Sequence, residues 1–154
     1  MGLGLRKPVA EIAGIETEPG LIVYRFAVGL FFANATGLAE QVRAMTSVTT
    51  PPRWFALLAD AMDDVDYTGG RTLVDTARSL HDRGITFAVV SASAKVRREL
   101  DAFGLGDVIG EERYYPTLRA LREAFAASPA SSPGAPAAAN DASADSAPGE
   151  PRST

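Results

Sequence analysis

The sequence contains no cysteine and only one histidine, His81. Disulfide frameworks, thiolate zinc sites and cysteine nucleophiles are therefore excluded, and a single imidazole is too few for a histidine-based metal centre. The G-x-S-x-G motif of serine hydrolases is also missing. We therefore expect a protein that is not an enzyme, with no catalytic residue, no bound metal and no required cofactor.

Long apolar runs and an excess of basic residues are lacking too. No uncharged run provides the roughly 18 apolar residues that a membrane span needs, and the longest candidate, residues 26–39, contains two glycines, an asparagine and a threonine. The formal net charge of -4 argues against a surface that binds polyanions. The first residues lack the apolar stretch of a signal peptide. We expect a soluble chain that neither inserts directly into a membrane nor binds nucleic acid.

Large apolar residues are missing from the last 27 residues, 128–154, which include eight Ala, six Ser and five Pro. Such a segment has little to bury against the entropy cost of ordering. The composition therefore predicts a disordered Ala/Ser/Pro-rich tail over 128–154 and one folded domain over 5–127.

Within the predicted domain, the hydrophobic pattern alternates between strand and helix spacing. Two short apolar runs, 9–16 and 21–28, flank the turn signal Glu18-Pro19-Gly20 and predict a hairpin. The later strands are expected at 54–60, 85–91 and 107–109, and the helices at 35–45, 73–80, 96–103 and 118–125. A hairpin followed by alternating strands and helices predicts an α/β fold, with a mostly parallel sheet and helices packed on it.

The segment that joins strand 54–60 to the next helix carries the strongest candidate site. Ligands of parallel sheets gather at the carboxyl ends of the strands, and the free N–H groups at a helix start favour an anion. That anion is either a ligand phosphate or a phosphate on Thr68 itself. The alternative is that Thr68 or Asp66 caps the helix while the glycines supply a tight turn. The candidate phosphoacceptor or anion- and nucleotide-binding residues are Asp66, Tyr67, Thr68, Gly69, Gly70 and Arg71.

Four carboxylates precede or join this turn, at Asp60, Asp63, Asp64 and Asp66. Oxygen ligands of this kind suit magnesium or a phosphoryl acceptor. The alternative, a solvated loop whose charge favours a helix N-terminus, is preferred. The GxxxxGK[ST] phosphate loop is absent.

The residues of the turn carry a resemblance to a known family. Asp66-Tyr67-Thr68-Gly69 resembles the D-x-[ST]-G signature of STAS domains, which sulfate transporters and anti-sigma factor antagonists share. Upstream, the stretch PGLIVYRF at 19–26 and the stretch LFFANA at 30–35 are similar to the cytoplasmic C-terminal STAS domain of bacterial SulP anion permeases. The resemblance extends over residues 5–126.

This resemblance implies a STAS fold and a cytoplasmic regulatory or interaction domain of a sulfate or related anion transporter in a bacterial inner membrane. The implied partners are the transmembrane portion of the same transporter and regulatory proteins. Binding of GTP or GDP at the Thr68 turn is also implied. The second implied role is a freestanding anti-sigma factor antagonist that acts as a phosphorylation switch, although Tyr67 is bulky and the acceptor is threonine rather than the usual serine.

The adjacent pair Phe31 and Phe32 is a candidate partner interface. Successive residues of an extended chain point to opposite sides, so we expect one of the two rings near the surface. An exposed aromatic ring beside other apolar groups indicates a contact site. We expect Leu30, Phe31, Phe32 and Trp54 to be mainly structural, with any exposed member belonging to an interface with the transmembrane region. The resemblance places Asn34 at the start of the first helix, as a cap.

Overall fold

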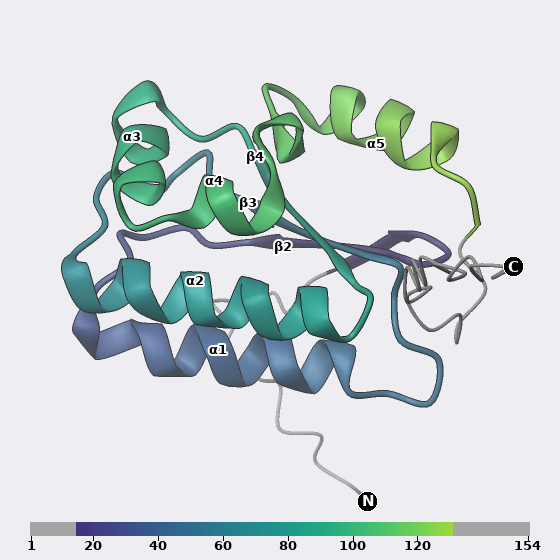
Figure 1. The fold of residues 1–154 in the computed structure, drawn as a ribbon, viewed down its shortest axis with the longest axis horizontal. Coiled ribbons are helices and arrows are strands. Elements are labelled where there is room, and N and C mark those ends of the chain that lie inside the picture. The colour runs from purple at the N-terminus through teal and green to yellow at the C-terminus, as the bar shows by residue number, and fades with distance from the viewer. Residues whose placement is uncertain (1–14, 131–154) are drawn as a thin grey trace, which may run out of the picture.

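The computed structural model describes residues 15–130, which form a five-stranded sheet with helices on both faces (Figure 1). The strands are β1 (Ile15–Glu18), β2 (Leu21–Arg25), β3 (Trp54–Leu58), β4 (Thr86–Val90) and β5 (Tyr114–Tyr115). They lie side by side in the order of the chain, β1-β2-β3-β4-β5. Only the β1–β2 pair is antiparallel. The predicted α/β class, with an N-terminal hairpin and a mostly parallel sheet, is therefore confirmed.

The hairpin turn is fixed by Gly20, whose φ of 88° lies in the left-handed region that glycine adopts without strain. The carbonyl oxygen of Gly20 accepts hydrogen bonds from the backbone N–H groups of Arg53 at 2.8 Å and Trp54 at 2.9 Å. The turn therefore also positions the start of β3. Residues 9–14 of the predicted first strand lie outside the described residues.

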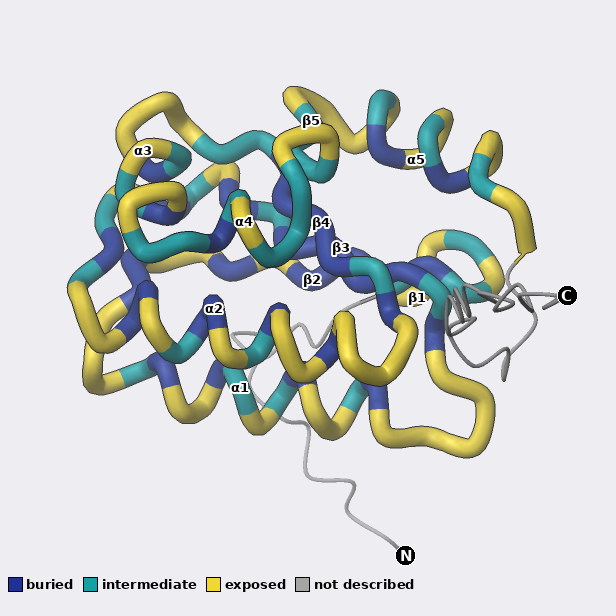
Figure 2. The backbone as a smooth tube through the Cα atoms, viewed as in Figure 1, coloured by how far each residue is buried: buried dark blue, intermediate teal, exposed yellow. Residues whose placement is uncertain are grey.

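One face of the sheet is covered by α1 (Phe32–Thr46), α2 (Tyr67–Asp82), α3 (Ala94–Ala102) and α4 (Leu105–Ile109). The apolar spacing of α2 places its buried residues on one side, against the strands. Phe55 and Phe87 of the neighbouring strands β3 and β4 point to the same face, with ring centroids 6.1 Å apart. The core therefore contains both strand and helix residues. Figure 2 shows the buried strands between helices whose outer sides are exposed.

The other face is covered by α5 (Leu118–Ala127). Leu121 and Phe125 of this helix pack with Trp54 of β3, and the Phe125 ring meets the indole edge-on at 5.7 Å. Thr117 caps the helix by accepting a hydrogen bond from Ala120 at 3.1 Å. Trp54 is therefore structural, as expected. The predicted boundary between domain and tail at residue 128 stays a prediction, since residues 131–154 lie outside the described part.

One predicted strand is wrong. The segment predicted as a strand at 107–109 belongs to helix α4, because Leu105, Val108 and Ile109 have the i, i+3, i+4 spacing that places all three on the core side. The short strand instead follows a 3-10 turn, η1 (Glu111–Arg113). Two residues, Tyr114 and Tyr115, are too few to show a strand period.

The helices of residues 15–130 are all too short or too polar to cross a lipid bilayer.

Candidate functional site at the carboxyl edge of the sheet

The candidate site lies where the chain leaves β2 and β3 and enters α1 and α2. The segments 28–32 and 63–67 run side by side there, joined by a parallel bridge between Leu30 and Val65. The N–H of Leu30 donates to the carbonyl of Asp64 at 2.9 Å, and the N–H of Asp66 donates to the carbonyl of Leu30 at 3.0 Å. As a result α1 and α2 begin next to each other, at the left of the view in Figure 1.

Asp66 is the N-terminal cap of α2, and it also serves α1. Its Oδ1 accepts a hydrogen bond from the Gly69 N–H at 2.6 Å, and its Oδ2 accepts one from the Phe32 N–H at 2.9 Å. Phe32 is the first residue of α1. A carboxylate in this position stabilises both helix N-termini, where the dipoles favour negative charge. Of the two caps that the sequence allowed, the structure has Asp66 and not Thr68.

Gly69 and Gly70 lie inside the first turn of α2 and are both buried. A Cβ on Gly69 would stand 2.5 Å from the Leu30 carbonyl oxygen, and a Cβ on Gly70 would stand 2.1 Å from the Phe103 ring. These distances are far below van der Waals contact. The glycines therefore allow α2 to approach the 28–32 segment and Phe103, rather than forming a tight turn before the helix.

Tyr67, Thr68 and Arg71 are exposed on the outer side of the same helical turn. Within residues 15–130, the Thr68 hydroxyl has no hydrogen-bond partner and Arg71 has no ion pair. The backbone N–H groups of Tyr67 and Thr68 likewise have no acceptor among the described residues. These groups are the ones that an anion or a modifying enzyme could reach. The predicted anion or nucleotide site at this turn stays a prediction.

The neighbouring carboxylates are mostly committed to other contacts. Asp60 makes a two-point ion pair with Arg25, with Nε–Oδ1 and Nη2–Oδ2 distances of 3.0 Å. The hydrogen bond from Arg25 lowers the pKa of Asp60. Asp64 binds Lys95 at 2.7 Å, and the hydrogen bond from that ammonium lowers the pKa of Asp64. In the described part of the chain, no group of three acidic or histidine side chains is arranged to hold a metal ion.

Four exposed apolar residues lie at or just before the start of the two helices: Val28, Phe31, Phe32 and Tyr67. We call them the hydrophobic rim. Their exposed fractions are 54%, 38%, 74% and 71%, in that order. The Tyr67 ring meets Phe103 edge-on at 5.9 Å. Leu30, by contrast, is fully buried, as expected.

Asn34 holds the backbone of the rim. Its Oδ1 accepts a hydrogen bond from the Phe31 N–H at 2.9 Å, and its Nδ2 donates to the Gly29 carbonyl at 2.8 Å. Asn34 thus supplies a cap, as the resemblance implied, but from inside α1. The helix begins at Phe32, three residues earlier than predicted.

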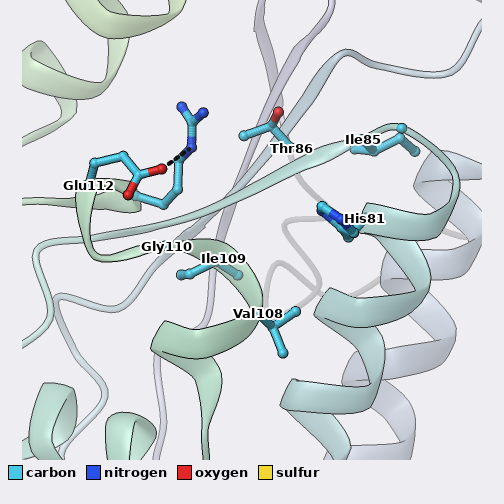
Figure 3. Close-up of a pocket in the computed structure, with 9 residues that line it drawn as sticks. His81, Ile85, Thr86, Val108, Ile109, Gly110 and Glu112 are labelled. Atoms are coloured by element: carbon cyan, nitrogen blue, oxygen red, sulfur yellow. Dashed lines mark ion pairs between the residues drawn. The ribbon is translucent and has the colours of Figure 1, made fainter. Parts of the chain in front are cut away.

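Sequence reasoning found the turn and the phenylalanine pair but missed two features. It did not place Val28 and Tyr67 together with the phenylalanines, because no local pattern brings residues 28 and 67 together. It also missed a pocket of about 360 Å³ near the C-terminal end of α2 (Figure 3). The apolar residues that line this pocket, Ile85, Val108 and Ile109, cannot be told from core residues in the sequence. The Asp66–Arg71 residues do not line this pocket; its polar lining includes His81, Glu112 and Arg113.

Comparison with known proteins places the chain in a family. The model of the STAS domain matches residues 13–121, so the chain belongs to the STAS domain family. A probable sulfate transporter of Mycobacterium tuberculosis is 38% identical over 110 residues, which cover 70% of this chain and 19% of the transporter. The chain therefore spans about a fifth of the length of the curated relatives it matches.

Solved structures agree with this assignment. The STAS domain of a SulP transporter from Vibrio cholerae is 30% identical, with a TM-score of 0.59 over 71% of this chain and 87% of that domain. A putative anti-sigma factor antagonist from Thermotoga maritima has a TM-score of 0.59 at 20% identity over 68% of this chain and 86% of that chain. The second likeness shows the shared fold alone.

Proposed function

We propose that this chain is the cytoplasmic regulatory and interaction domain of a bacterial SulP-type sulfate or related anion transporter. It acts through contact with the transmembrane portion of the same transporter at the inner membrane, and it catalyses no reaction. The observation that carries the proposal is the 38% identity with a probable sulfate transporter over 110 residues of the chain. The likeness to the Vibrio SulP domain supports the same role.

The hydrophobic rim supports a contact role. Its aromatic residues are exposed, while hydrogen bonds to Asn34 and Asp66 fix the backbone N–H groups of Phe31 and Phe32. Exposed apolar clusters of this kind mark sites of protein or membrane contact. Phe31 and Phe32 are the proposed interface residues, and regulatory proteins are further candidate partners.

A chimeric transporter tests the proposal. The matching segment of the Mycobacterium tuberculosis transporter is replaced by residues 13–121 of this chain, and sulfate uptake is measured in a bacterium that lacks its own uptake system. We expect the chimera to transport sulfate, and a version with the segment deleted to transport poorly. Equal uptake by the chimera and the deleted version would overturn the proposal.

A second candidate function is a freestanding anti-sigma factor antagonist that works as a phosphorylation switch. The exposed Thr68 hydroxyl at the start of α2 favours it, because a kinase could reach this atom without unfolding the helix. Mass spectrometry of the chain purified from its own cells tests this candidate. A phosphate on Thr68 would support it, and an unmodified Thr68 under all growth conditions would contradict it.

A further inference from the structure

The hydrophobic rim, defined above as Val28, Phe31, Phe32 and Tyr67, adjoins a loop whose Asp63 carboxylate has no ion pair within residues 15–130. We propose that the rim and the acidic loop 63–66 together form a docking surface for a basic, apolar protein segment on the cytoplasmic side of the transporter's membrane portion. This inference rests on the proposed function and adds the chemistry of the partner.

Most of the large exposed apolar side chains of residues 15–130 lie in the rim. Six large hydrophobic residues are exposed in the described part of the chain, and four of them lie in the rim. The other two, Val48 and Leu118, belong to separate parts of the fold. Because aromatic side chains form most of the strong anchors in protein interfaces, Phe32 and Tyr67 are the expected centre of the contact.

The rim is also held in a fixed position. The Asp66 carboxylate binds the Phe32 N–H, Asn34 binds the backbone of Phe31 and Gly29, and the bridge at Leu30 joins the two segments. Little backbone entropy remains to be lost when a partner binds. An exposed apolar surface on a rigid support is suited to docking.

The acidic loop determines which partner fits. Asp63 is exposed, and its Oδ1 lies 3.1 Å from the position that a Cβ on Gly29 would occupy, so this carboxylate stands beside the rim. Within residues 15–130 the Asp63 side chain has no ion pair; Lys95 reaches only the Asp63 backbone carbonyl, at 2.9 Å, and pairs with Asp64. Asp66 is bound by two backbone N–H groups and by no cation in the same range. The Asp63 carboxylate next to the rim therefore remains without a positive partner, whereas the charge of Asp66 lies against the two helix N-termini that it caps.

This charge favours a basic protein segment over a lipid surface. Anionic lipid headgroups would be repelled by Asp63. The cytoplasmic loops of membrane proteins, in contrast, carry an excess of Lys and Arg close to apolar residues. Such a segment can place its apolar side chains on Phe32 and Tyr67 and a cation beside Asp63.

The test uses the full 154-residue chain and lipid vesicles of phosphatidylethanolamine and phosphatidylglycerol. One set of vesicles holds the membrane portion of the Mycobacterium tuberculosis transporter without its matching segment, and the other set holds no protein. Phe32→Ser removes the central anchor and Asp63→Lys reverses the free charge. Val48→Ser and Glu40→Lys are matched controls, since both residues are exposed and lie off the rim.

We expect the chain to bind the protein-loaded vesicles, with binding weakened about tenfold or more by Phe32→Ser and by Asp63→Lys, and little changed by the controls. Added salt should weaken the binding of the parent chain to these vesicles more than it weakens the binding of Asp63→Lys. Equal binding to protein-free vesicles, or unchanged binding by Asp63→Lys, would overturn this inference.

The same four substitutions in the chimeric transporter separate the two proposals. If the unsubstituted chimera transports sulfate but Phe32→Ser and Asp63→Lys leave uptake unchanged, the docking surface is wrong and the proposed function stands. If the unsubstituted chimera fails as the deleted version does, the proposed function fails and the docking surface fails with it. Circular dichroism of each variant confirms that it folds.

Discussion

The carboxylate of Asp66 accepts a hydrogen bond from the backbone N–H of Phe32, 34 residues earlier in the chain, at 2.9 Å. The same side chain caps its own helix through Gly69. A residue of the D-x-[ST]-G signature thus sets the relative position of two helices and, through Phe32, of the hydrophobic rim. Within the signature, Asp66 therefore has a structural role, whereas the side chain of Thr68 is exposed and accessible to other molecules.

Replacing Asp66 is expected to destabilise the fold more than replacing Thr68. Asp66→Ala leaves both helix N-termini without their acceptor, so the free energy of unfolding should fall by about 1–3 kcal/mol. Asp66→Asn keeps one acceptor oxygen and should cost less. Thr68→Ala should change the unfolding free energy by less than about 0.5 kcal/mol. Urea denaturation measures all three, and an equal loss for Asp66→Ala and Thr68→Ala would contradict the assignment of the cap.

Alanine at the two glycines of α2 is expected to destabilise, although alanine favours helices. Gly69→Ala brings a methyl group against the Leu30 carbonyl, and Gly70→Ala brings one against the Phe103 ring. Gly37 of α1 provides the control, because a Cβ there would meet nothing within 4 Å. Gly37→Ala should therefore raise stability by about 0.5–1 kcal/mol. Thermal unfolding of the three variants gives the sign of each stability change. A stability gain for Gly69→Ala would show that α2 does not pack tightly against Leu30.

The ion pair of Asp60 with Arg25 should contribute stability that depends on pH. The hydrogen bond from Arg25 lowers the pKa of Asp60 in the folded chain. A lowered carboxyl pKa stabilises the fold above the unfolded value, about 3.9, and that contribution is lost as the pH falls through the folded value. The parent chain should therefore exceed Asp60→Asn in unfolding free energy at pH 6, and the difference should shrink below about pH 4. A difference that stays constant from pH 6 to pH 2 would rule out this linkage.

Guanine nucleotide binding at the Thr68 turn is tested by titrating the chain with GTP and following backbone amide resonances. We expect weak binding, with a dissociation constant of about 1 mM or more, because Asp66 opposes a phosphate. The shifts should be largest at Tyr67 and Thr68, whose N–H groups have no acceptor among the described residues. Arg71→Ala should reduce them. Shifts that map to the pocket near His81 would place any nucleotide at the opposite end of α2.

The local sequence pattern was sufficient to predict the elements whose structure depends on burial and on residues adjacent in the chain. The continuous apolar runs around Phe55 and Phe87 predicted the central strands, and Glu18-Pro19-Gly20 predicted the hairpin. The same reasoning failed at 107–109, where three apolar positions fit a short helix as well as a strand. It also placed the start of α1 too late, because the acceptor for the Phe32 N–H comes from Asp66, far along the chain. The turn itself was found from sequence, but whether Asp66 or Thr68 caps the helix depended on side-chain geometry.

The order of the strands has a consequence for folding kinetics. Each strand pairs with the one that precedes it in the chain, so no strand has to be inserted between two partners that are already joined. Each parallel pairing, such as Leu21 with Trp54 or Val89 with Tyr114, therefore closes within a single strand–helix–strand unit. During synthesis the sheet can extend from the hairpin one strand at a time, each followed by the helix that covers it, with β5 added last.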